Sequence, residues 1–123
     1  MQALAGATEG LHLLVLYGSR ARGENRDGSD WDFGYVADPS SDIGMFTAGL
    51  VQLVGTDAVD LVDLSTASAL LRYRVAADGV VVHEDQRGGF VDFKVEAVRF
   101  WCDAGPVIAE AHRQVLEHLG SRA

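Results

Sequence analysis

Residues 18–34 read GSRARGENRDGSDWDFG, and they follow directly on the apolar run LHLLVLY of residues 11–17. A continuous apolar run of this length between glycines is typical of a strand that is covered on both faces. Gly18 and Ser19 then predict a tight turn, and ten residues separate Ser19 from Asp30. Asp32 follows with one residue between, so a strand that begins here carries a pair of carboxylates.

The pair Asp30 and Asp32 indicates a cation site. Side chains at positions i and i+2 of a strand point to the same face. Two carboxylates about 4 Å apart repel by roughly 4 kcal/mol at an effective dielectric near 20. A divalent cation removes that repulsion, and hard oxygen ligands suit Mg²⁺. The backbone N–H groups of the Gly18-Ser19 turn are suited to a phosphate, so the pattern favours metal-assisted chemistry on a nucleoside triphosphate.

The rest of the chain predicts an α/β fold with a small sheet of about four strands packed by helices. The predicted strands are Leu11–Tyr17, Trp31–Ala37, Ala58–Leu64 and Val80–Glu84. The predicted helices run from Ile43 to a stop at Gly55, over Ser65–Ala77, from Gly89 to an interruption at Gly105-Pro106, and from about Pro106 to Leu119. The segment before the first strand is short and leaves little room for a helix. In the helix from Gly89, an apolar stripe from Phe90 to Trp101 and also Cys102 are expected in the core.

Length and composition bound the possible functions. The 123 residues predict one domain, 1–123, and the net charge of −8 with a single lysine argues against direct nucleic-acid binding. A small substrate or a basic protein partner fits this charge better. One cysteine excludes a disulfide framework, and no signal peptide or membrane-spanning run is present, so we expect a cytoplasmic protein.

A third carboxylate is available on the strand Ala58–Leu64. Asp60 and Asp63 have opposite strand parity, so only one of them can face the site, and Asp63 is alternatively a cap for the helix that follows. Arg20 and Arg22 are each candidates for contacting a triphosphate, with a structural carboxylate as the competing partner. His12 lies within the first apolar strand and is expected to be a core histidine.

Four blocks in this order resemble the minimal nucleotidyltransferase (MNT) family of the DNA polymerase beta-type nucleotidyltransferase superfamily. The blocks are LYGSRARG (16–23), SDWD (29–32), VDLVDL (59–64) and LRYR (71–74). Tyr17 departs from the family, in which Phe is common at this position. The resemblance implies a mixed sheet, with Asp30, Asp32 and Asp60 as the catalytic carboxylates that hold two Mg²⁺ ions. It also implies that Gly18 and Ser19 bind the nucleotide phosphates, and Arg22 is our candidate to assist them.

The resemblance further implies transfer of AMP from ATP to a hydroxyl. Many minimal enzymes of this kind are antitoxins of a HEPN-domain ribonuclease toxin, and some modify a tyrosine of that toxin. Two alternatives stay open: a small-molecule acceptor such as an aminoglycoside, and a non-catalytic antitoxin that acts by binding alone. Self-association, the acceptor and the nucleotide preference are not determined by the sequence.

Overall fold

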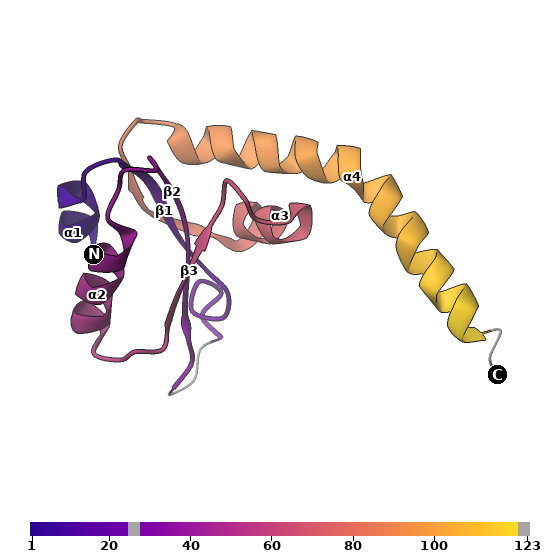
Figure 1. The fold of residues 1–123 in the computed structure, drawn as a ribbon, viewed down its shortest axis with the longest axis horizontal. Helices are drawn as coiled ribbons and strands as arrows, with labels where there is room; N and C mark the ends of the chain where they lie inside the picture. The colour runs from indigo at the N-terminus through magenta and orange to yellow at the C-terminus, as the bar shows by residue number, and fades with distance from the viewer. Residues whose placement is uncertain (25–27, 121–123) are drawn as a thin grey trace.

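The computed structural model describes residues 1–24 and 28–120, and it describes the side chains of all of these except 104–112 and 114–120. This part of the chain forms one four-stranded sheet with helices on both faces (Figure 1). In chain order the elements are α1 (Gln2–Ala7), β1 (Leu11–Tyr17), β2 (Trp31–Ala37), α2 (Ile43–Val54), β3 (Val59–Asp63), α3 (Ala69–Asp78), β4 (Val80–Glu84) and α4 (Gly89–Gly120). The predicted α/β fold and its four strands are confirmed.

The sheet is mixed and has the strand order β3-β2-β1-β4. β1 pairs antiparallel with β2 and with β4, whereas β2 and β3 run parallel. Parallel neighbours need a crossover connection, and α2 supplies it between β2 and β3. This arrangement brings the end of β1 beside the beginnings of β2 and β3.

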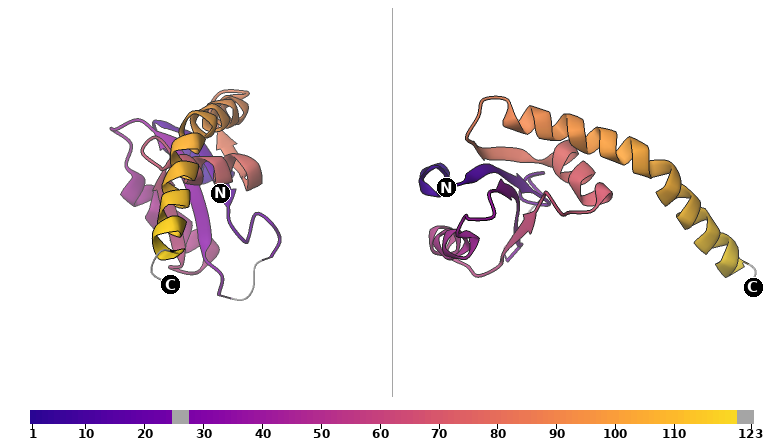
Figure 2. Two further views of the ribbon diagram at one scale, coloured as in Figure 1. Left: turned by 90° about the vertical axis from the view of Figure 1, so that its right-hand side faces the viewer. Right: turned by 45° about the horizontal axis from the view of Figure 1, so that its top comes forward.

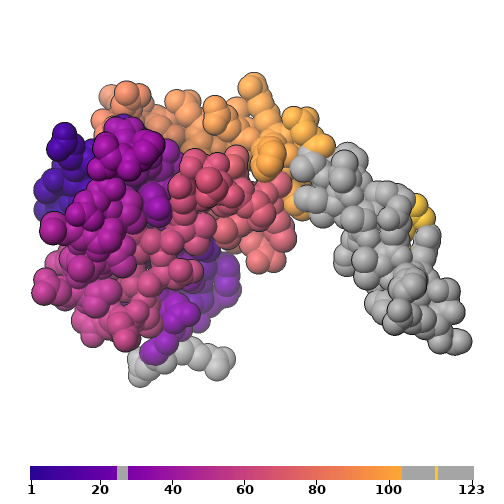
Figure 3. Space-filling model, in the orientation of Figure 1, coloured from indigo at the N-terminus to yellow at the C-terminus, as the bar shows by residue number. Residues whose placement is uncertain are grey.

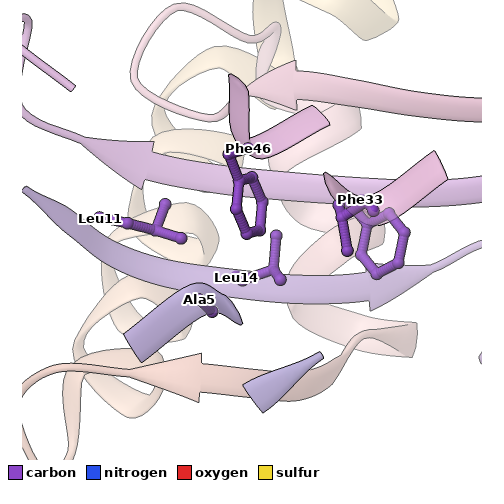
Figure 4. Packing of buried hydrophobic residues seen from close by; sticks show 6 residues of the cluster. Ala5, Leu11, Leu14, Phe33 and Phe46 are labelled. Atoms are coloured by element: carbon purple, nitrogen blue, oxygen red, sulfur yellow. The ribbon is translucent and has the colours of Figure 1, made fainter. Parts of the chain in front are cut away.

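Two apolar cores cover the two faces of the sheet, because successive side chains of a strand point to opposite sides. On one face Leu14 and Phe33 pack with Phe46 of α2, as Figure 4 shows. On the other face Val15 packs with Val75 of α3 and with the first residues of α4. The continuous apolar run of β1 therefore feeds both cores, as the sequence predicts for a strand that is buried on both sides.

Helix α2 begins and ends where the sequence predicts. The Asp42 side chain accepts a hydrogen bond from the Met45 backbone N–H at 3.0 Å and so caps the first turn. Gly55 ends the helix in the left-handed conformation with φ = 74°.

The absence of a helix before β1, which we expected from the short segment there, is wrong. Residues Gln2–Ala7 form α1, and Ala5 is fully buried against the first core. α1 also approaches α2 at Gly49, where a Cβ would lie 2.9 Å from Leu4 Cδ2.

The predicted interruption at Gly105-Pro106 is also wrong, since the backbone stays helical from Gly89 to Gly120. A proline within a helix removes one backbone hydrogen bond and often kinks the helix without ending it. The α4 ribbon bends along its length in Figures 1 and 2.

The apolar stripe of α4 is only partly in the core. Phe90 and Ala97 are buried, but Val98 is 44% exposed and Cys102 is exposed, so the expectation of a buried Cys102 is wrong. The first part of α4 lies against the body of the molecule in the space-filling view (Figure 3). Among the described residues, no helix combines the length and the apolar composition needed to cross a membrane.

Candidate active site

Tyr17, Asp32 and Asp60 form a row across three adjacent strands. Tyr17 is paired with Asp32 in the β1–β2 ladder, and Asp32 is paired with Asp60 in the β2–β3 ladder. Paired residues of neighbouring strands point to the same face of the sheet, which here is the face covered by α3 and α4. Asp30 precedes Asp32 by two residues just before β2 begins. The fold thus gathers the three predicted carboxylates at one end of the sheet.

Asp63 has a different role from Asp60. It is paired with Tyr35 rather than with Asp32. Its Oδ1 accepts hydrogen bonds from the Ser65 backbone N–H at 2.9 Å and from the Ser65 hydroxyl at 2.6 Å. Asp63 therefore caps the turn after β3, while Ser68 caps α3 itself. This geometry leaves Asp60 as the carboxylate beside Asp32.

The charges of this row influence one another. The pKa of the Asp32 carboxyl is raised above its ordinary value, first by partial burial and then by the negative charges of Asp30 and Asp60. The pKa of the Tyr17 hydroxyl is also raised, first by burial and then by Asp32 and Asp60. Negative charge is thus concentrated where the ends of three strands meet, and a cation would be stabilised there.

The donor set fits a hard divalent cation, because it consists of carboxylate oxygens. Among the side chains that the structure describes, no three from His, Cys, Asp or Glu are placed to hold one ion together in this conformation. Asp30 and Asp60 are exposed, so their side chains can rotate without displacing packed atoms.

Gly18 lies directly against the Asp32 carboxylate. Its φ is +77°, in the left-handed region that favours glycine, and a Cβ at this position would lie 2.5 Å from Asp32 Oδ2. The turn that follows is closed by backbone hydrogen bonds from Arg22 to Gly18 and from Glu24 to Ser19. Both the turn and the contact with Asp32 therefore require a residue without a side chain.

A cavity of about 380 Å³ opens beside this turn. Its lining residues come from the end of β1, the turn, β2 and α3: Tyr17, Gly18, Ser19, Arg22, Asp32, Leu71, Arg74 and Asp78. The three predicted phosphate-binding residues thus share one cavity with Asp32, whereas Asp30 and Asp60 are outside its lining. A cavity of about 430 Å³ between α1 and α2 contains none of the predicted site residues.

The contribution of α3 to this cavity was not predicted. Leu71, Arg74 and Asp78 recur at helical spacing, which places them on one face of α3. That spacing, together with an arginine on the same face, is the signal that could have identified them.

The structure separates the two candidate arginines. Arg22 lines the cavity, where its Nε lies 3.1 Å from Glu24 and one of its terminal nitrogens lies 3.7 Å from Asp78. Arg20 donates a hydrogen bond of 2.9 Å to the Ser29 carbonyl oxygen, and its guanidinium lies 4.1 Å from the centre of the Trp31 ring. Arg20 therefore stabilises the base of the loop between β1 and β2.

His12 is not a core residue, contrary to our expectation. Its side chain is 41% exposed, and its two ring nitrogens contact Asp85 at 2.5 Å and Asp38 at 2.7 Å. The hydrogen bonds to Asp85 and then Asp38 raise the pKa of the imidazole from 6.5 to about 9. This cluster lies at the opposite end of β1 from Tyr17.

The chain is similar to known proteins in sequence and in structure. In sequence, the chain is 32% identical over 96 residues to the protein adenylyltransferase MntA of Aphanizomenon flos-aquae (strain 2012/KM1/D3). That match covers 68% of this chain and 64% of the relative, so this chain spans less than two thirds of the relative's length.

Solved structures of toxin-antitoxin complexes contain similar chains. A chain of a toxin-antitoxin crystallised with AMP-PNP superposes with a TM-score of 0.64 at 26% identity, over 84% of this chain and 87% of that chain. A chain of a variant MntA toxin-antitoxin complex also gives 0.64 at 26% identity, over 89% of this chain and 91% of that one.

The statistical model of the family described as "Polymerase beta, Nucleotidyltransferase" matches residues 2–88, a range that contains the whole sheet and α3. This range is more than half of the chain and includes every predicted site residue. The chain therefore belongs to the polymerase beta nucleotidyltransferase family.

Proposed function

We propose that this protein transfers AMP from ATP to a tyrosine hydroxyl of a HEPN ribonuclease toxin and so acts as its antitoxin. The observation that carries the proposal is the arrangement of Asp32 and Asp60 in one row beside the Gly18-Ser19 turn. The similar chain named protein adenylyltransferase MntA and the similar toxin-antitoxin crystallised with AMP-PNP support the nucleotide and the partner. We propose one minimal nucleotidyltransferase domain over residues 1–123.

In this proposal Gly18, Ser19 and Arg22 bind the phosphates of ATP. The absence of a side chain at Gly18 allows the phosphates to approach the backbone closely. The Ser19 hydroxyl makes no hydrogen bond to any other described residue, so it is available as a donor. The Arg22 guanidinium supplies positive charge at the same cavity.

Asp30, Asp32 and Asp60 would hold two Mg²⁺ ions in the working enzyme. Bound Mg²⁺ neutralises charge on the phosphates and stabilises the charge that develops as the phosphoryl group is transferred. The partial burial of Asp32 and the mutual repulsion of the carboxylates favour a bound cation over the empty carboxylate cluster.

At the α-phosphorus the reaction forms one bond and breaks one, and the acceptor hydroxyl gives up its proton. The acceptor oxygen bonds to the α-phosphorus, the bond from the α-phosphorus to the α–β bridging oxygen breaks, and pyrophosphate leaves. We assign the acceptor's proton to Asp60, because Asp60 is exposed and lies on β3, the edge strand of the sheet. An acceptor protein can approach this edge from outside the sheet.

The charge of the chain supports a protein acceptor. A net charge of −8 favours association with a basic partner. The free Cys102 is compatible with a reducing compartment, so we place the reaction in the cytoplasm.

The direct test is incubation with Mg²⁺, the HEPN toxin and ATP labelled at either the α- or the γ-phosphate. The proposal predicts that the toxin takes up α-label and no γ-label, and that Asp32→Asn removes the uptake. Uptake of γ-label would indicate a kinase and would contradict the proposal.

The same assay separates the alternatives. Label on an aminoglycoside and none on the toxin would show that the protein is a nucleotidyltransferase that modifies a small molecule. Full neutralisation of the toxin by the triple variant Asp30→Asn, Asp32→Asn, Asp60→Asn would establish an antitoxin that acts by binding alone.

A further inference from the structure

Helix α3 presents a second arginine to the cavity beside the Gly18-Ser19 turn. Arg74 lines this cavity together with Ser19, Arg22 and Asp32. It lies outside the Gly-Ser and Asp-x-Asp motifs, about fifty residues further along the chain. The cavity therefore has positive side chains from two separate elements, the turn after β1 and α3.

The two arginines of the cavity differ in their partners. The Arg22 guanidinium contacts the carboxylates of Glu24 and Asp78. Arg74 has no hydrogen bond or ion pair to any residue in the described part of the chain, and its side chain is exposed. Its charge is thus available to a ligand, whereas part of the charge of Arg22 is already compensated.

The backbone that carries Arg74 is fixed by packing. The next residue, Val75, is fully buried in the second core, and the Ser68 hydroxyl caps the start of α3. Gly79, directly after the helix, lies so close to Val15 of β1 that a Cβ there would lie 2.5 Å from Val15 Cγ1. The helix is thereby held against the strand that ends at the turn.

The ligand chemistry follows from these charges. A nucleoside triphosphate brings several negative charges into a cavity that already contains the Asp32 and Asp78 carboxylates. A guanidinium offers a planar pair of donors that matches two phosphate oxygens, which an ammonium does not. The group that best fits Arg74 is therefore a polyphosphate.

We propose that Arg74 binds the triphosphate of the nucleotide in the cavity that it lines together with the Gly18-Ser19 turn. This inference rests on the proposed function for the identity of the nucleotide. It adds a binding residue from α3 that the motifs around the turn and the carboxylates do not contain.

The test measures the dissociation constant of AMP-PNP by calorimetry with Mg²⁺ for the wild type, Arg74→Gln, Arg74→Lys and Arg87→Gln. Arg87 is a matched control: it is exposed, has no ion pair within the described residues and lies in the turn between β4 and α4. Loss of a charged bidentate contact predicts binding about 10- to 100-fold weaker for Arg74→Gln. Arg74→Lys should fall between Arg74→Gln and the wild type, and Arg87→Gln should stay within twofold of the wild type.

A second measurement localises the contact on the ligand. Inorganic tripolyphosphate should displace AMP-PNP from the wild type and should lose most of that ability with Arg74→Gln. The inference is overturned if Arg74→Gln binds AMP-PNP within twofold of the wild type, or if tripolyphosphate competes equally well on both proteins. Weaker binding accompanied by a loss of thermal stability in Arg74→Gln and in Arg74→Lys alike would also overturn it, because that result indicates a structural role.

These experiments distinguish a failure of the Arg74 inference from a failure of the proposed AMP transfer. If the wild type binds AMP-PNP through Arg74 but labels no toxin, the transfer reaction fails while this inference stands. If the wild type labels the toxin and Arg74→Gln binds AMP-PNP normally, only this inference fails.

Discussion

Asp32 of β2 and Asp60 of β3 are direct partners in a parallel ladder, so two carboxylates lie side by side on one face of the sheet. Like charges at paired positions destabilise a sheet. Asp60→Asn should therefore raise the free energy of unfolding in EDTA by about 0.5 kcal/mol, a melting-temperature increase of about 2 °C, because one exposed charge is removed. The same variant should lose AMP transfer. Thermal unfolding with chelator and the transfer assay check both effects, and a lower melting temperature of Asp60→Asn in EDTA would contradict the repulsion.

Substitution of Asp63 should have the opposite effects to substitution of Asp60: it should lower stability and leave AMP transfer intact. Its carboxylate holds the turn before α3 through the backbone N–H and the hydroxyl of Ser65. Asp63→Ala should destabilise the protein by about 1–2 kcal/mol because these hydrogen bonds are lost, while AMP transfer under stabilising conditions is retained. Urea unfolding and the transfer assay measure the two properties. Loss of transfer in a folded Asp63→Ala protein would mean that the functional carboxylate of β3 has been misassigned.

Gly18 and Gly23 provide a matched pair in one turn. Both have positive φ, but a Cβ at Gly18 would collide with Asp32 while a Cβ at Gly23 would meet nothing within 4 Å. Gly23→Ala should cost about 1 kcal/mol from backbone strain alone and should leave transfer intact. Gly18→Ala should cost about 2–3 kcal/mol and displace Asp32, with loss of transfer. Equal effects of the two variants on stability and on transfer would show that the Gly18–Asp32 contact has no special importance.

The His12 cluster predicts a dependence of stability on pH. The imidazole pKa is raised from 6.5 to about 9 by hydrogen bonds to Asp85 and Asp38, so the folded state holds this proton more tightly than the unfolded state. The stabilisation is complete below pH 6.5 and is lost as the pH rises through about 9. Because the side chain is 41% exposed, we expect less than about 1 kcal/mol.

An NMR titration of the His12 ring, with urea unfolding at pH 6 and pH 9.5, measures this effect. His12→Gln should remove that part of the pH dependence without affecting AMP transfer, since the cluster lies at the far end of β1 from the carboxylates. A midpoint of the ring titration near 6.5 would contradict the paired geometry.

The sequence predicts the elements of the sheet well, because the apolar runs and the glycines act locally. The run Leu11–Tyr17 and the stop at Gly55 depend on neighbouring residues alone, and both predictions are confirmed. The helix Gln2–Ala7 was missed because its stability comes from packing of Ala5 and from the space that Gly49 leaves for Leu4. Such tertiary contacts have no signal in the short segment itself.

For the site too, the sequence predicts what depends on neighbouring residues and misses what depends on tertiary packing. The spacing from Ser19 to Asp30 is a local pattern, and the fold places both residues beside Asp32. Strand parity predicts that Asp60 and Asp63 point to opposite faces of the sheet. It does not predict which of the two lies beside Asp32, because that depends on the pairing of β2 with β3. The contribution of Arg74 depends on how α3 packs against β1, which the local sequence does not contain.

We propose above that this protein transfers AMP to the partner toxin and that the transfer requires Asp32 and its neighbouring carboxylates. Intact-mass spectrometry of the HEPN toxin after incubation with this protein, ATP and Mg²⁺ tests it most directly. We predict a toxin heavier by one or more AMP units with the wild-type protein and an unchanged toxin with Asp32→Asn, although both proteins bind the toxin. An unchanged toxin mass with the folded wild-type protein, or an equal gain of mass with Asp32→Asn, would contradict AMP transfer by these carboxylates.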